Sequence, residues 1–179
     1  LQQEDFYGIL KFMDGMPVNI RLLDPPLHEF VPKSQAGQEA MALEMGKSID
    51  VIKHRVESLK EVNPMLGLRG CRLGITYPEI TAMQTKAILG AATRLKREGF
   101  NPKPEIMVPL VGTYKELEQQ QKVIKTAAEE LFKEEGMEVE FKLGTMIEIP
   151  RAALTADQIA KYADYFSFGT NDLTQMGFG

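Results

Sequence analysis

Short stretches in which apolar and polar residues alternate are separated by longer stretches with helical spacing. Val18, Ile20 and Leu22 alternate with polar neighbours, which predicts a β-strand over residues 16–23. Residues 105–111 are almost entirely apolar, as expected of a strand that is buried on both faces. Similar patterns predict three further strands, at residues 69–75, 141–149 and 165–169.

Amphipathic helices are predicted before and between these strands. The first covers residues 1–13, and one or two polar helices fall within residues 35–61. Three later helix starts have a Thr followed three residues on by Glu or Gln, the pattern of a capping box: Thr76 with Glu79, Thr113 with Glu116, and Thr155 with Gln158. The alternation predicts an α/β fold with a parallel sheet, in a single domain over residues 1–179.

Composition restricts the partners and the compartment of the chain. A net charge of −4 does not favour a nucleic-acid partner, and no apolar run approaches the roughly 18 residues of a membrane span. Cys71 is the single cysteine, so it cannot form an internal disulfide, and we expect an inert buried thiol. With no signal-peptide pattern, the expected location is cytoplasmic. The chain does not begin with Met, and we expect it to be part of a longer protein.

Several polar residues fall near the ends of the predicted strands or just after them, and Arg69 lies in the second strand region. In a parallel β/α sheet the carboxyl ends of the strands share one edge, where active sites of (β/α)8 barrels form. The residues in question are Arg21, Arg69, Glu148, Thr170, Asn171 and Asp172. Two carboxylates can hold Mg²⁺, and two guanidinium groups fit phosphate or carboxylate. The pattern predicts a pocket for a small phosphorylated acid, with the metal acting as a Lewis acid on a developing enolate.

Each of these residues also has a structural interpretation. An arginine at a strand end often makes an ion pair, and Arg72 competes with Arg69 as the functional one. Glu148 could face solvent at the edge of the sheet, and Thr170 or Asn171 could cap a helix. It is their joint placement at strand ends that favours a site.

Five segments carry a resemblance to a known family. They read IRLLDPPLHEF, NPMLGLRGCRLGITYPEI, PEIMVPLVGT, GTMIEIPRAALTADQIA and FSFGTNDLTQM. The chain closely resembles, over nearly its whole length, the C-terminal phosphoenolpyruvate-binding domain of the pyruvate, phosphate dikinase family. Phosphoenolpyruvate synthase and enzyme I of the sugar phosphotransferase system are more distant alternatives, and the first segment favours the dikinases. A non-catalytic binding fragment is a third interpretation.

The resemblance implies a parallel (β/α)8 TIM barrel, incomplete in this chain, which holds about five of the eight strands. In this family the barrel binds phosphoenolpyruvate or pyruvate with Mg²⁺. A phosphoryl group passes between the substrate and a phosphohistidine on another domain, and a third domain binds ATP. The whole enzyme converts ATP, pyruvate and phosphate to AMP, phosphoenolpyruvate and diphosphate, and we expect it to be a homodimer.

The resemblance also assigns roles to residues. Glu148 and Asp172 match the metal ligands. The substrate-binding set comprises Arg21 and Arg69 at the phosphoryl group, together with Glu148, Gly169, Thr170, Asn171 and Asp172. The family's proton-donating cysteine stands in a Cys-Gly-Glu motif that is absent from this chain. We therefore expect no catalytic residue in the chain and no activity from it alone.

Overall fold

The computed structural model describes residues 1–25, 27–60 and 66–178. The chain divides into two compact units. The first combines Leu1–Asp24 with Gly70–Gly179, and the second is Pro25–Arg69. The expectation that residues 1–179 form a single domain stays a prediction.

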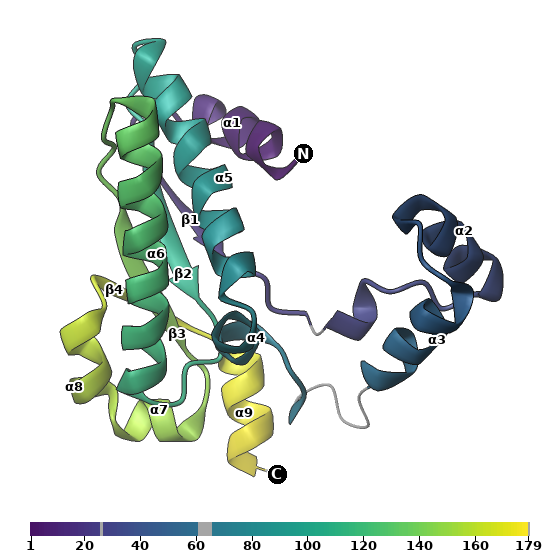
Figure 1. Cartoon of the computed structure of the whole chain (residues 1–179). Helices are drawn as coiled ribbons and strands as arrows, with labels where there is room; N and C mark the ends of the chain where they lie inside the picture. The colour runs from purple at the N-terminus through teal and green to yellow at the C-terminus, as the bar shows by residue number, and fades with distance from the viewer. Residues whose placement is uncertain (26, 61–65, 179) are drawn as a thin grey trace. The chain divides into compact units, whose positions relative to one another are not determined.

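The first unit is built on a parallel sheet of four strands in the order β1-β2-β3-β4 (Figure 1). The strands are β1 (Pro17–Arg21), β2 (Lys103–Val108), β3 (Lys142–Ile147) and β4 (Tyr165–Phe168). Each strand pairs in parallel with the next. The result is a curled half-barrel of the α/β class, as expected for an incomplete TIM barrel.

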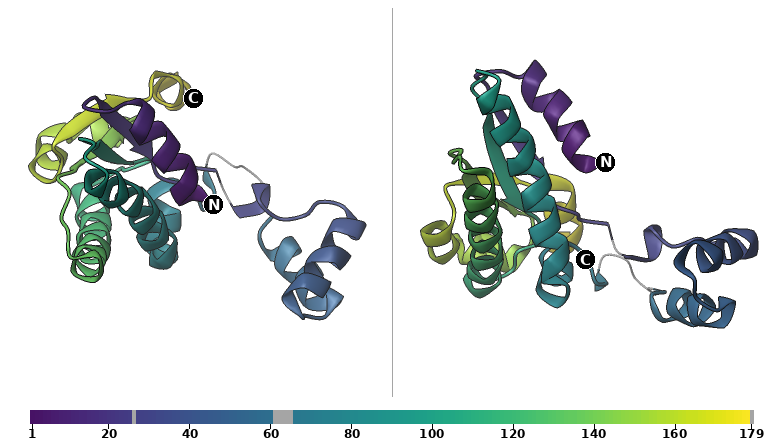
Figure 2. Two further views of the ribbon diagram at one scale, coloured as in Figure 1. Left: turned by 90° about the horizontal axis from the view of Figure 1, so that it is seen from above. Right: turned by 45° about the horizontal axis from the view of Figure 1, so that its top comes forward.

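Helices connect and cover the strands of this unit. They are α1 (Gln2–Phe12), α4 (Gly70–Thr76), α5 (Pro78–Arg97), α6 (Tyr114–Glu135), α7 (Pro150–Leu154), α8 (Ala156–Ile159), η3 (Ala160–Tyr162) and α9 (Thr170–Phe178). The long helices α5 and α6 lie side by side against one face of the sheet, and α1 packs against α5 (Figures 1 and 2).

The core of the first unit lies between the sheet and its two long helices. Leu89 of α5 and Ile124 of α6 are fully buried, as are Ile106 and Val108 of β2. Burying each such side chain contributes about 1.5–3 kcal/mol. Alternate strand residues such as Asn19 are exposed, so the two faces of the sheet differ. This alternation is the period-2 signal that allowed the strand to be predicted.

The predicted strand at residues 69–75 is wrong, because this segment forms helix α4. The sheet of this unit therefore has four strands where five were expected. The buried residues of α4 are Gly70, Cys71, Leu73 and Gly74, a spacing that lines one side of a helix. The segment is short and apolar, and in such segments the helical and strand patterns are hard to separate.

One of the three predicted capping boxes is confirmed. At the start of α6, the Thr113 N–H donates to Glu116 Oε2 at 2.8 Å, and both halves of the box are present. The boxes at Thr76 and Thr155 are wrong. Each of these hydroxyls donates instead to the carbonyl four residues earlier. Helix α5 begins two residues after Thr76, with proline in its first turn.

The second unit contains η1 (Leu27–Glu29), α2 (Gln35–Met45) and α3 (Ile49–Ser58). Ser34 caps α2 and Ser48 caps α3 through their side-chain oxygens. The two helices confirm the prediction for residues 35–61, apart from residue 61, which lies outside the described residues. In the described part of the whole chain, no helix has both the length and the apolar character needed to cross a bilayer.

Candidate functional site

The carboxyl ends of β3 and β4 bring two of the predicted segments together. Ile147 pairs with Phe168, so the residues that follow, Glu148 and Gly169, lie side by side. A Cβ atom on Gly169 would lie 2.5 Å from Glu148 Oε2. Only a glycine leaves room for the Glu148 carboxylate here, which supports placing both residues in one site.

Glu148 is completely buried, contrary to its alternative interpretation as a solvent-facing edge residue. Its Oε1 accepts a hydrogen bond from the Leu110 N–H at 2.7 Å. Its Oε2 has no donor among the described residues. The neighbouring Asp172 carboxyl can donate to it only when Asp172 is itself protonated. Burial raises the pKa of Glu148 to about 7; the Leu110 hydrogen bond opposes this rise, and hydrogen bonding and repulsion from Asp172 add to it.

The backbone of Leu110 is in the left-handed region, with φ at 60°. For a residue other than glycine this conformation costs free energy and is found mainly where function requires it. Here it accompanies the N–H bond to Glu148. Gly70, itself at φ 56°, allows the close approach, because a Cβ there would lie 2.9 Å from the Leu110 side chain. A backbone group leaves no signature in residue type, so the sequence analysis missed Leu110.

A third carboxylate, also missed from the sequence, belongs to this site. Asp24 is nearly buried, and its Oδ2 lies 3.7 Å from Arg21 Nη1 at the end of β1. Its negative charge is one cause of the raised pKa of Glu148, so the two carboxylates lie near one another. The sequence did contain a signal for Asp24, since it is an acidic residue three positions after Arg21 and just beyond a predicted strand. The half-exposed guanidinium of Arg21 is thus within ion-pair distance of Asp24 at this edge of the sheet.

The GTND stretch provides the first turn of α9. Thr170 and Asn171 are exposed and Asp172 is half-buried, while the Leu173 N–H donates to the Gly169 carbonyl at 2.9 Å. A helix does start here, but Thr170 and Asn171 are its first two residues and Gly169 precedes it, so the expectation that Thr170 or Asn171 caps the helix is wrong. A helix start at this point is compatible with a site. The free N–H groups and dipole of a helix N-terminus favour a bound anion.

The remaining predicted residues have different outcomes. Arg69 is the last residue of the second unit, and its role in substrate binding stays a prediction. Arg72, its competitor, is a half-buried residue of α4. Cys71 is buried, its Sγ–H donates to the Leu110 carbonyl at 3.1 Å, and burial raises the pKa of its thiol to about 12. The expectation of a buried thiol is confirmed, and the raised pKa favours the expected lack of reactivity.

The donor set of this site fits a hard cation. The described residues include no group of three or more His, Cys, Asp or Glu side chains placed to hold a metal. Mg²⁺ is commonly bound by one or two carboxylates, with substrate oxygens and water completing its shell. Glu148 and Asp172 supply such a pair, and the buried Glu148 Oε2 lacks a donor of its own.

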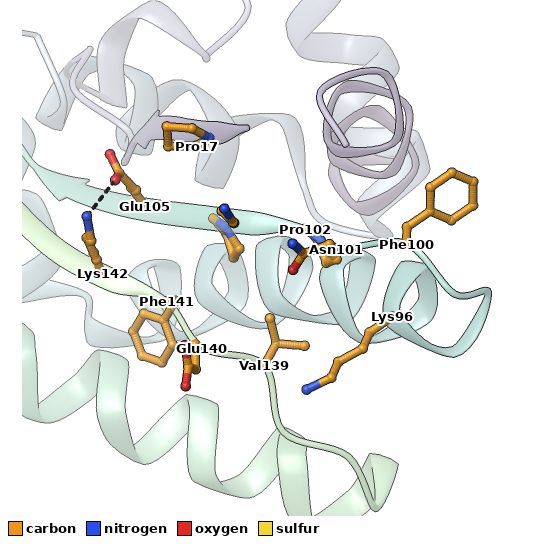
Figure 3. Close-up of a pocket in the computed structure, with 12 residues that line it drawn as sticks. Pro17, Lys96, Phe100, Asn101, Pro102, Glu105, Val139, Glu140, Phe141 and Lys142 are labelled. Carbon is orange, nitrogen blue, oxygen red and sulfur yellow. Dashed lines mark ion pairs between the residues drawn. The ribbon is translucent and has the colours of Figure 1, made fainter. Parts of the chain in front are cut away.

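A large hollow in the first unit lies elsewhere. It has a volume of about 800 Å³ and lies at the amino ends of β2 and β3, where Lys103 and Phe141 line it together with Lys96 from the last turn of α5 (Figure 3). Two of its charges are paired, with Lys142 Nζ 3.5 Å from Glu105 Oε1. No residue predicted for the site lines it. In β/α barrels this end serves stability, so we place the site at the opposite edge.

Relatives of the chain are pyruvate, phosphate dikinases from plants and from a protist. "Pyruvate, phosphate dikinase, chloroplastic" of Mesembryanthemum crystallinum is 58% identical over 180 residues, which cover 99% of this chain and 19% of the relative. "Pyruvate, phosphate dikinase 1, chloroplastic" of Arabidopsis thaliana has the same identity and coverage. "Pyruvate, phosphate dikinase" of Giardia intestinalis is 56% identical over 178 residues, covering 99% of this chain and 20% of the relative. The chain thus spans about one fifth of the length of these relatives.

The plant relatives contradict the expected cytoplasmic location. The names of the Mesembryanthemum and Arabidopsis proteins place them in the chloroplast. The expectation failed because a low cysteine content indicates only that structural disulfides are absent. It does not distinguish one compartment without disulfides from another.

A family model provides the broadest comparison. It describes the PEP-utilising enzyme, PEP-binding domain, and it matches residues 1–179, the whole of the chain. This match agrees with the dikinase relatives and with the parallel half-barrel. The chain belongs to the family of phosphoenolpyruvate-binding domains of PEP-utilising enzymes.

Proposed function

We propose that this chain is the substrate-binding part of a pyruvate, phosphate dikinase. It binds phosphoenolpyruvate or pyruvate together with Mg²⁺ at the carboxyl edge of its sheet. The observation that carries the proposal is the pairing of a fully buried Glu148 with Asp172, beside the N-terminus of α9. Family membership and the names of the relatives support the choice of substrate class.

Each residue has a distinct task in this proposal. Glu148 and Asp172 hold Mg²⁺, which when bound supplies positive charge and Lewis acidity to the substrate oxygens. Arg21, paired with Asp24, presents a planar donor fork to the phosphoryl group. The role expected for Arg69, a second such fork, stays a prediction.

The start of α9 completes the pocket. Gly169 admits the Glu148 carboxylate, and Thr170 and Asn171 bind the carboxylate and phosphate side of the substrate. These donors are fixed by the fold before the substrate arrives. Charge that spreads over the phosphoryl oxygens during transfer is therefore stabilised with little rearrangement.

The whole reaction requires parts of the protein outside this chain. In it, the P–O bond of phosphoenolpyruvate breaks and a P–N bond forms to a histidine on another domain, while a cysteine gives the product its proton. A nucleotide-binding domain then exchanges the phosphoryl group with AMP and diphosphate to give ATP and phosphate, and the protein works as a homodimer. Equivalent chemistry in a phosphoenolpyruvate synthase or enzyme I is the alternative, but the dikinase relatives favour the first assignment.

The decisive variant is Asp172→Asn in the intact protein. It keeps the size of the side chain and removes the charge that Mg²⁺ requires. We expect at least a 100-fold loss of Mg²⁺-dependent turnover, and phosphoenolpyruvate binding, measured by calorimetry, that no longer responds to Mg²⁺. The matched control is Asp157→Asn, which makes the same change at an exposed position on α8 and should retain activity.

The same experiment can reject the proposal. Near-normal turnover in Asp172→Asn would remove Asp172 from the metal site. An intact protein that binds phosphoenolpyruvate equally well with EDTA and with Mg²⁺ would remove the metal from the binding step. Dependence of turnover on diphosphate separates a dikinase from a phosphoenolpyruvate synthase, which does not use it.

A further inference from the structure

A buried side chain from α5 holds the segment that follows β1. Gln84 is only 5% exposed, and its Oε1 accepts a hydrogen bond from the Leu23 N–H at 2.8 Å. Its Nε2 donates to Gln2 Oε1 at 3.5 Å, so both ends of the amide are used. Leu23 lies between Arg21 and Asp24, the ion pair of the candidate site.

The sheet itself does not fix this segment beyond Leu22. The Leu22 N–H still donates to the Met107 carbonyl at 2.9 Å, which continues the ladder between β1 and β2 by one bond. The next N–H, that of Leu23, turns to Gln84. The chain then leaves the first unit after Asp24, whose carbonyl accepts a bond from the Gly70 N–H at 3.3 Å. The Gln84 amide therefore replaces the missing strand partner.

A small pocket borders this segment. It has a volume of about 10 Å³ and is lined by Leu22, Leu23 and Gln84, among others. Side chains that border a cavity lose contact partners on that side. The position of the backbone between Arg21 and Asp24 depends correspondingly more on its hydrogen bond.

The helix that carries Gln84 is joined to its neighbouring helix inside the core. One turn before it, the Thr81 hydroxyl donates to Gln120 Oε1 at 2.8 Å, which joins α5 to α6 within the core. Thr81 and Gln120 are both buried. Gly74 of α4 leaves room for this contact, because a Cβ there would lie 2.5 Å from Thr81 Oγ1. The helix that carries Gln84 is thus fixed where it meets the segment.

We infer that Gln84 is a positioning residue for the phosphoryl-binding arginine. Its bond to the Leu23 N–H sets the backbone between Arg21 and Asp24, and so sets where the Arg21 guanidinium meets a phosphorylated substrate. The inference rests on the proposed function. Gln84 should affect the binding of phosphoenolpyruvate more than that of pyruvate, because pyruvate has no phosphoryl group for Arg21 to bind.

The test compares Michaelis constants in the intact dikinase. Gln84→Leu keeps the bulk of the side chain and removes the acceptor, which leaves a buried N–H without a partner. We expect a rise of about fivefold to tenfold in KM for phosphoenolpyruvate, with KM for pyruvate changed less than twofold. Gln84→Glu keeps an acceptor oxygen for Leu23 and should recover most of the difference. Thr85→Val is the matched control, because it removes a buried hydroxyl that bonds only within α5, to the Thr81 carbonyl.

The outcomes distinguish this inference from the proposed function. If Arg21→Ala weakens phosphoenolpyruvate binding but Gln84→Leu, folded by circular dichroism, leaves both constants unchanged, the inference on Gln84 fails alone. An equal rise in both constants also overturns it, because that result indicates general destabilisation. If Arg21→Ala leaves phosphoenolpyruvate binding unchanged, the proposed function fails. Should Gln84→Leu not fold, Gln84→Met, which is unbranched like Gln, is held to the same criteria.

Discussion

Replacing Glu148 with Gln is expected to stabilise the metal-free protein at pH 8 while abolishing its Mg²⁺-dependent activity. The carboxyl is fully buried, and burial raises its pKa from the usual 4.5 to about 7. Between these two values the folded state binds a proton that the unfolded state has lost. Stability therefore falls as the pH rises through this window, and it stays at the lower level above pH 7.

The size of the effect follows from the difference in pKa. At 1.36 kcal/mol per pKa unit, a rise from 4.5 to about 7 corresponds to roughly 3 kcal/mol of lost stability above pH 7. Gln carries no charge, so the variant should escape this loss. It also keeps a carbonyl oxygen that can accept the Leu110 N–H, so the contact that orients the side chain survives.

The difference in stability between the wild type and Glu148→Gln can be measured locally by hydrogen exchange of the β3 amides. The experiment uses the intact protein with EDTA present. The free energy of opening in Glu148→Gln should exceed that of the wild type by about 2–3 kcal/mol at pH 8 and by much less at pH 5. Adding Mg²⁺ should stabilise the wild type and leave the variant unchanged. A variant that is less stable than the wild type at pH 8, or a difference that does not depend on pH, would refute the reasoning.

Three further predictions concern the glycines and the edges of the sheet. Gly169→Ala should displace the Glu148 carboxylate, because the new Cβ would lie 2.5 Å from Oε2, and a Mg²⁺ titration should show at least a tenfold weaker response. Gly144→Ala should lower stability by about 1–3 kcal/mol in thermal unfolding, since the new methyl group would collide with the Tyr165 ring; an unchanged melting temperature would contradict this packing. Residues 1–179 expressed alone should self-associate in analytical ultracentrifugation, because β1 and β4 are edge strands with unpaired backbone groups; a stable, cooperative and catalytically active monomer would contradict both this prediction and the expected inactivity.

The sequence predicted those parts of the fold in which a single periodicity dominates. Residues 105–111 are so apolar that only a buried strand was a reasonable interpretation, although β2 in fact ends at Val108. The capping box at Thr113 succeeded because the glutamate that completes it lies at the true third position of α6. At Thr76 the same Thr and Glu spacing does not form a capping box, because the proline two residues later fixes the start of α5 instead.

The site was predictable as far as it consists of side chains at strand ends. Glu148 and Asp172 came from that rule, and the structure brings them together. Leu110 could not be found from the sequence, because it contributes a backbone N–H group and an unusual φ angle. Residue type reveals neither of these. Gln84 was hidden for a different reason: a polar residue within an amphipathic helix is normally assigned to its solvent face.

Two features of this edge cost free energy. The buried Glu148 has a raised pKa, and Leu110 is held in a left-handed conformation. Unfavourable features of this kind persist where a bound ligand offsets them. In the hollow at the opposite edge, the described charges Glu105 and Lys142 neutralise each other. The two unfavourable features therefore favour the edge around Glu148 over that hollow as the candidate site.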